Sequence, residues 1–185
     1  MSELRTSFIE TASGIAFYPY QPKTDQININ DISHALSHLC RFGGHSKFFY
    51  SVAQHSILVS EYLKREGRSP LIQLYGLLHD ASEGYLVDLP SPLKKGMPDY
   101  VEIEKGLQMI IWDALGIPVP SDEINKVIKD VDVLFQNYEA NILLPVAAWA
   151  DKSVSIKQLE IREEKMSDVR TKFLARFNEL IKQTE

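Results

Sequence analysis

The feature that most constrains the fold is a helical spacing of apolar residues, which begins near Asn28 and continues almost to the end of the chain. Apolar side chains recur there every three or four residues, the period of one face of an α-helix. Glycines and prolines interrupt this pattern after each helix length. The sequence therefore predicts an all-α protein, a bundle of about six helices with almost no sheet.

Helix boundaries follow from capping and helix-breaking residues. Asn30 or Asp31 can cap the first helix, and Gly43-Gly44 is expected to end it. Ser121 can cap a later helix. Further helices are expected over about residues 48–65, 100–115 and 156–182, and a loop over residues 89–100.

The N-terminal part has a different pattern. Residues 7–20 carry aromatic and β-branched side chains around Ser13-Gly14, which favours a small β-hairpin. No repeat or linker divides the chain. We expect a single domain over residues 1–185, with an N-terminal extension (1–27) and a helical core (28–185).

Charge and cysteine content exclude several classes of partner. A net charge of −5 gives no general attraction to nucleic acid polymers or to anionic membranes. Cys40 is the single cysteine, so an internal disulfide is excluded and a reducing cytoplasm is favoured. No apolar run approaches the roughly 20 residues that span a bilayer, and the first residues do not resemble a signal peptide. The expected location is cytoplasmic.

Ionisable residues interrupt three apolar helices. His79-Asp80 ends the segment LYGLLHD, and His55 lies among apolar neighbours in YSVAQHSILVS. Asp132 lies within IKDVDVLF, where Asp130 competes with it; the apolar flanks favour Asp132, and Asp130 is expected to face solvent. Charged groups are rarely buried unless they are paired or bind a metal. Imidazoles with carboxylates suit a divalent transition metal.

The order His, His-Asp, Asp on three helices resembles the HD-domain superfamily of metal-dependent phosphohydrolases. SVAQHSILVS, LLHDASEGYLVDLPSPLK and DVDVLFQNYEA are similar to its ligand-bearing segments, and the resemblance covers about residues 11–145. It implies an HD-domain helical bundle in which one divalent metal (Co, Mn, Mg, Zn or Fe, with Co or Mn favoured) is held by His55, His79, Asp80 and Asp132.

The resemblance also implies roles near the metal. Arg41 matches a phosphate-binding arginine, and Phe42 matches an aromatic residue that contacts the nucleoside, where similar proteins have tryptophan. Glu83 matches the acid that positions the attacking water, and Asp88 an acid near the sugar. Further residues implied or considered at the substrate are Lys94 and Lys129, which match phosphate contacts, and His45, which is either a phosphate contact or a loop histidine.

Glu139 and the two tryptophans each allow more than one interpretation. Glu139 could bond a ligand histidine or Arg41, and Trp112 and Trp149 are interpreted as core or interface residues without chemistry. The expected function is hydrolysis of phosphate from (deoxy)nucleoside phosphates, including purine nucleotides and triphosphates. The alternatives are a monophosphate-only nucleotidase, a cyclic-nucleotide phosphodiesterase and a non-catalytic nucleotide sensor. The expected partner is a small-molecule nucleotide, and a homo-oligomer is compatible with the resemblance.

Overall fold

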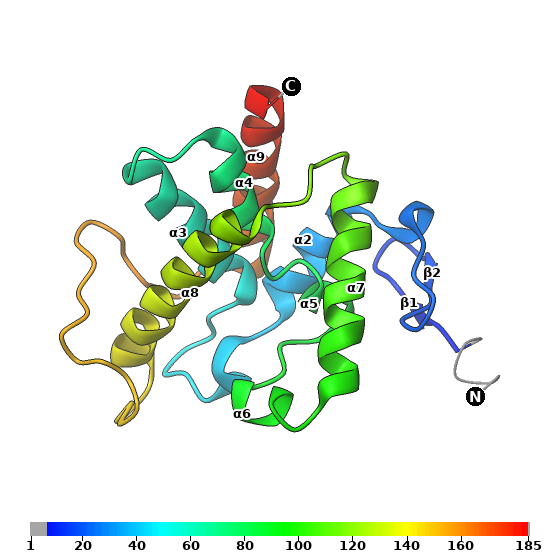
Figure 1. Cartoon of the computed structure of the whole chain (residues 1–185). Helices are drawn as coiled ribbons and strands as arrows, with labels where there is room; N and C mark the ends of the chain where they lie inside the picture. Colours follow the sequence, from blue (N-terminus) through cyan, green and yellow to red (C-terminus); the bar gives the residue numbers. More distant parts are fainter. Residues whose placement is uncertain (1–6, 185) are drawn as a thin grey trace.

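In the computed structural model, which describes residues 7–184, six helices of nine residues or more build the molecule (Figure 1). They are α2 (Ile29–His38), α3 (Val52–Arg65), α4 (Pro70–Leu78), α7 (Pro98–Ala114), α8 (Asp122–Leu143) and α9 (Met166–Thr184). Short helical turns accompany them: η1 (Thr24–Gln26) precedes α2, η2 (Arg41–Gly44) lies between α2 and α3, and α5 (Glu83–Leu86) and α6 (Ser91–Lys94) lie between α4 and α7. The all-α prediction is confirmed. Residues 1–6 of the predicted extension lie outside the described residues.

The centre of the bundle is α3, which contacts α2, α4, α8 and α9. The most extensive packing is between α3 and α4. A Cβ at Gly76 of α4 would lie 2.4 Å from Cδ1 of Leu63 and 3.2 Å from Cγ1 of Val59, so glycine permits this packing. α9 packs against both α3 and α4 and also contacts α2 (Figure 1). Because α3, α4 and α8 meet in the core, polar residues on them are brought together.

The predicted N-terminal hairpin is confirmed at one edge of the molecule (Figure 1). β1 (Ile9–Glu10) pairs with β2 (Ala16–Phe17) in antiparallel register. Asp31 accepts hydrogen bonds from the backbone N–H of Ser13 and from the hydroxyls of Ser13 and Thr11. The predicted cap of α2 was wrong for this reason: Asn28 caps the helix, and Asp31 holds the hairpin instead.

The predicted start of α3 at residue 48 and the predicted end of α2 at Gly43-Gly44 were also wrong. The residue that follows α2, Leu39, accepts a backbone hydrogen bond from Val52, and the N–H of Arg41 donates to Tyr50. In this short antiparallel bridge, the backbone around Cys40 and the backbone around Ser51 are extended, so neither segment can be helical. The helix can begin only where Ser51 accepts a hydrogen bond from the N–H of Gln54.

Two further boundaries differ from the prediction. The expected loop at residues 89–100 contains the short helix α6 and the first turn of α7, which begins with Pro98 in the first-turn position that suits proline. Residues 156–165, expected to be helical, are not part of α9. Ser121 caps α8 as predicted. Across residues 7–184, no helix has both the length and the apolar character that crossing a bilayer requires.

Candidate metal centre

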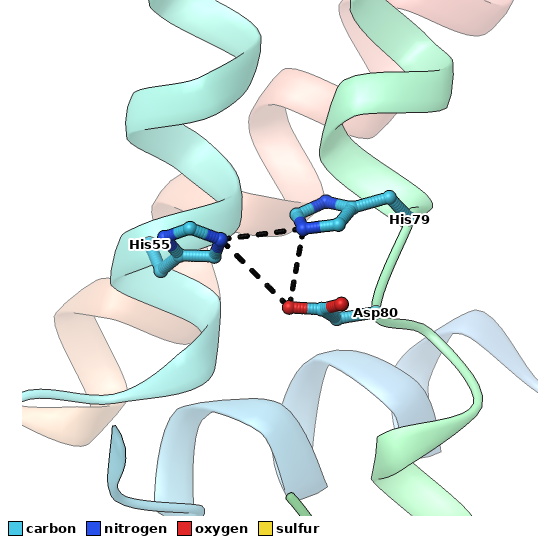
Figure 2. Close-up of side chains that lie close together, drawn as sticks. All are labelled: His55, His79 and Asp80. Carbon is cyan, nitrogen blue, oxygen red and sulfur yellow. Dashed lines mark hydrogen bonds and ion pairs between the residues drawn. The ribbon is translucent and has the colours of Figure 1, made fainter. Parts of the chain in front are cut away.

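Two histidines from neighbouring helices face each other inside the bundle. His55 lies in the first turn of α3, and His79 follows directly after the last residue of α4. Their Nε2 atoms are 3.2 Å apart, and Nε2 of His79 lies 3.2 Å from Oδ2 of Asp80 (Figure 2). These three residues form a group that could hold a metal ion.

The other ring nitrogen of each imidazole is already hydrogen-bonded. Nδ1 of His55 lies 2.8 Å from Oε1 of Glu139, and Nδ1 of His79 lies 2.8 Å from the carbonyl oxygen of Gly76. Because a carbonyl or an ionised carboxylate can only accept, each Nδ1 carries a proton and donates it. When neutral, each imidazole therefore has its lone pair on Nε2. Two lone pairs at this distance repel unless a positive charge lies beside both.

A carboxylate from α8 approaches the same point. Oδ1 of Asp132 lies 3.3 Å from Nε2 of His55 and 3.8 Å from Nε2 of His79. Burial alone would lower the pKa of His79, but Asp80 and Asp132 outweigh it and raise that pKa well above its usual value. The cluster thus attracts positive charge. Two imidazole nitrogens and two carboxylates are donors that fit a divalent transition metal.

The neighbouring acid on α8, Asp130, lies elsewhere. It pairs with Lys126 over 2.6 Å, and its side chain is 65% exposed. The corresponding value for Asp132 is 17%. Positions two apart on a helix point about 200° apart. The structure therefore brings Asp132, and not Asp130, to the histidines.

Arg41 lies beside this cluster, also buried. Its Nε donates to Oε2 of Glu139 over 3.0 Å, and its NH1 lies 3.7 Å from Oδ2 of Asp80. Tyr50 donates a third hydrogen bond to Glu139, over 2.8 Å. Burial by itself would raise the pKa of the Glu139 carboxyl, but Arg41 and His55 hold it below its usual value. Both alternatives considered for Glu139 are found in the structure, because its carboxylate contacts His55 and Arg41 at the same time.

A cavity of about 610 Å³ opens next to the cluster. Nine of the eleven predicted site residues line it, namely Arg41, Phe42, His45, Asp80, Glu83, Asp88, Lys94, Lys129 and Asp132. The other two, His55 and His79, contact Asp80 and Asp132 at its wall. This volume lies in the range typical of small-molecule sites.

The lysines in the cavity are not free charges. Lys94 donates to Oε1 of Glu83 over 3.3 Å and to Glu104 over 2.6 Å. Lys129 donates to Oδ2 of Asp132 over 2.7 Å, with its side chain 70% exposed. The other oxygen of Glu83, Oε2, is buried and has no hydrogen-bond partner among residues 7–184. Burial, Asp80 and Asp88 raise the pKa of Glu83 well above its usual value.

Backbone strain marks two sides of the cavity. Phe42 has a φ of 54°, and Gly43 and Gly44 continue this left-handed turn. Val87, directly before Asp88, has a φ of 75°, which is rare for a β-branched residue. Such residues persist only where the surrounding structure holds them, and they cluster at functional sites.

Among the cavity-lining residues that were not predicted as site residues, three on α8 and the segment after it stand out. Trp149, interpreted as core or interface, lines the cavity together with Leu144 and Gln136. Gln136 lies one helical turn after Asp132, so its spacing could have suggested it. Leu144 and Trp149 follow the end of α8, and nothing in the local sequence indicates where that segment lies.

Comparison with known proteins gives two relatives, which differ in sequence identity and in the share of the chain that is matched. The match to the uncharacterized protein YfdR of Escherichia coli has 44% identity over 112 residues, and it covers 60% of each chain. The uncharacterized protein RCAP_rcc00048 of Rhodobacter capsulatus is 33% identical over 174 residues, which cover 87% of this chain and 89% of the relative. The chain belongs to the family of this Rhodobacter protein. No protein-family model matches the chain.

Proposed function

We propose that the chain is a metal-dependent phosphohydrolase of the HD-domain superfamily that acts on small nucleotides. The observation that carries this proposal is the convergence of His55, His79, Asp80 and Asp132 beside Arg41 at the wall of one cavity. Four donors of this kind hold one divalent metal, for which Co or Mn is our first choice. When bound, such an ion lowers the pKa of a coordinated water and neutralises charge on phosphate oxygens.

Arg41 is the phosphate-binding group in this proposal. Its Nε is engaged by Glu139, which gives the side chain one orientation, and Arg41 lines the cavity with NH1 3.7 Å from Oδ2 of Asp80. A planar guanidinium matches the spacing of two phosphate oxygens. Its burial removes competing water and strengthens this attraction. Arg41 therefore orients the phosphate against the ligand cluster.

Glu83 is the proton acceptor. Its buried Oε2 has no partner in the part of the chain that the structure describes, whereas Oε1 accepts a hydrogen bond from Lys94. An unpartnered buried carboxylate oxygen costs free energy unless a water or a substrate group donates to it. The raised pKa of Glu83 makes this carboxylate a better base, because it binds a proton more tightly. Glu83 would thus orient the attacking water and accept its proton.

The test is phosphate release from nucleoside mono-, di- and triphosphates. Protein freed of metal with a chelator is assayed alone and after addition of Co, Mn, Mg, Zn or Fe, and the products are identified. We expect turnover to require added metal. The His79→Ala substitution should abolish it. His38→Ala, an exposed histidine on α2, serves as the control and should keep full activity. Full turnover in the metal-free protein would overturn the proposal.

A further inference from the structure

Trp149 is a large aromatic residue in an unusual position. Its side chain lines the same cavity as the ligand cluster, yet the residue is 57% exposed. It lies on the segment that follows α8, between Leu144 and Asp151 (the Trp149 segment). Aromatic side chains normally bury most of their surface, so an exposed face at a cavity leaves favourable burial unused. A ligand that covers this face would recover it.

The Trp149 segment is fixed to α8 by hydrogen bonds. The N–H of Asp151 donates to Oδ1 of Asn137, and Nδ2 of Asn141 donates to the carbonyl oxygen of Asp151, both over 2.7 Å. Lys152 closes the segment by donating to the carbonyl oxygen of Val146. Ala147 is buried and has a φ of 45°, so the turn is held in a strained conformation. The indole is therefore presented by an ordered segment.

Phe42 and Leu144 extend the apolar surface from Trp149 toward the phosphate-binding arginine. All three line the cavity, and Phe42 and Leu144 both pack on the small cluster of Ala140, Ala147 and Ala150. The ring of Phe42 lies 5.6 Å from the guanidinium carbon of Arg41. We name Phe42, Leu144 and Trp149 the aromatic wall. The cavity thus has an ionic part, with Arg41 and the metal ligands, and this apolar part.

We propose that the aromatic wall binds the base of a nucleoside phosphate, with Trp149 stacked on the base while Arg41 holds the phosphate. The inference rests on the proposed function for its phosphate end. A purine or pyrimidine is planar and apolar on its faces, so it suits an exposed indole, whereas a sugar phosphate alone would leave the indole uncovered. Stacking tolerates every base, so the wall distinguishes nucleotides from sugar phosphates more strongly than purines from pyrimidines.

The kinetic test compares two phosphate esters that differ only in the base. Specificity constants are measured with metal for 2′-deoxyadenosine 5′-monophosphate and for 2-deoxyribose 5-phosphate. Trp149→Ala should lower kcat/KM for the nucleotide about 5- to 150-fold, the range expected for one stacked base. It should change the sugar phosphate less than about twofold, and Trp149→Phe should retain most of the activity. Val146→Ala is the matched control, since Val146 is exposed on the same segment but does not line the cavity.

A binding test does not depend on turnover. The sequence contains two tryptophans, and Trp112 is buried against Tyr75 away from the cavity. In a Trp112→Phe protein, all indole emission comes from Trp149. We expect 2′-deoxyadenosine 5′-monophosphate to quench this emission and 2-deoxyribose 5-phosphate to leave it unchanged.

These outcomes separate the two proposals. Quenching by the nucleotide without hydrolysis of any phosphate ester would contradict the proposed function but support the base-binding wall. If the protein hydrolyses nucleotides and Trp149→Ala leaves the nucleotide kinetics unchanged, the proposal that the aromatic wall binds the base would be overturned. Absence of quenching of Trp149 emission by the nucleotide would overturn it as well. So would a Trp149→Ala variant that keeps its nucleotide kinetics and changes its mass in solution, because Trp149 would then be an interface between copies of the chain.

Discussion

His55 donates a hydrogen bond from Nδ1 to Oε1 of Glu139 over 2.8 Å, and neither side chain is exposed to solvent. The second oxygen of the same carboxylate accepts from Nε of Arg41. One buried acid therefore positions both a candidate metal ligand and the candidate phosphate-binding group. A carboxylate in this position also raises the basicity of the imidazole, which strengthens its bond to a metal.

Replacement of Glu139 should weaken metal binding although Glu139 does not reach the metal position. In Glu139→Gln the charge that holds Arg41 and His55 is lost while the size of the side chain is kept. We expect metal affinity to fall about 10- to 100-fold, the usual effect of such partners. Competition with a chelator measures it. Glu123→Gln, an exposed acid on the same helix, should leave the affinity unchanged.

Asp132 and Asp130 provide an internal comparison on α8. Asp132→Asn removes the charge from a carboxylate 3.3 Å from Nε2 of His55, so the protein should lose most of its bound metal. Asp130→Asn breaks an exposed ion pair with Lys126, and such a pair contributes only about 0.3–0.5 kcal/mol. This variant should therefore keep its bound metal. Metal content per chain after gel filtration decides between them. Equal loss in both variants would refute the assignment of Asp132.

Glu83 and Glu104 both accept hydrogen bonds from Lys94, but only Glu83 lines the cavity. Glu83→Gln should leave metal content and substrate affinity close to their normal values and lower kcat about 10²- to 10⁴-fold, because general base assistance is lost. Glu104→Gln should have a small effect. Normal turnover in Glu83→Gln would exclude Glu83 from proton transfer.

The parts of the site that could be predicted from the sequence lie on regular helices. An apolar helix that ends in His79-Asp80 is visible locally, because buried charged groups require partners. His55 and Asp132 are visible for the same reason. The position of Trp149 was not predictable, because it depends on hydrogen bonds that join its segment to Asn137 and Asn141 after the helix ends. No period in the sequence encodes such contacts.

The segment over residues 156–165 shows why apolar spacing was misleading there. Ile156 and Leu159 are buried, as a helical pattern would require, yet the backbone is not helical. Its carbonyl groups bind side chains instead: Tyr138 donates to Leu159, and Gln54 donates to Arg162. These tertiary hydrogen bonds replace the intrahelical ones. Spacing reports which side chains are buried and does not determine the backbone that buries them.

A stability prediction concerns Arg176, which joins α9 to α3 and α4. This buried arginine donates to Oγ and the carbonyl oxygen of Ser60 and to Oε1 of Gln73. Arg176→Ala removes the donor to Oγ of Ser60 and to Oε1 of Gln73 and leaves a cavity, so the free energy of unfolding should fall by about 3 kcal/mol or more. Urea unfolding measures it. Lys182→Ala, exposed on the same helix, should change it by less than about 0.5 kcal/mol.

Under the proposed function, we expect Lys129 to decide how well a substrate with more than one phosphate is bound. This lysine projects from α8 beside Asp132, lines the cavity and keeps 70% of its side chain exposed. It is therefore the residue that we expect to contact phosphates beyond the one assigned to Arg41 in our proposal. Lys94 is held more tightly, by Glu83 and Glu104, and leaves this pairing less easily. Lys129→Ala should therefore raise KM for a nucleoside triphosphate more than for the monophosphate. Lys94→Ala should affect both through Glu83.

The measurement compares specificity constants for the mono-, di- and triphosphate of one nucleoside. Removal of one exposed phosphate contact should cost about 0.5–1.5 kcal/mol, or roughly 2- to 10-fold, for the triphosphate. Lys126→Ala is the control, because Lys126 lies one turn earlier on α8, pairs with Asp130 and does not line the cavity. If Lys129→Ala affects all three substrates equally, or if the triphosphate is not hydrolysed, the chain is a monophosphate nucleotidase and Lys129 is a surface charge.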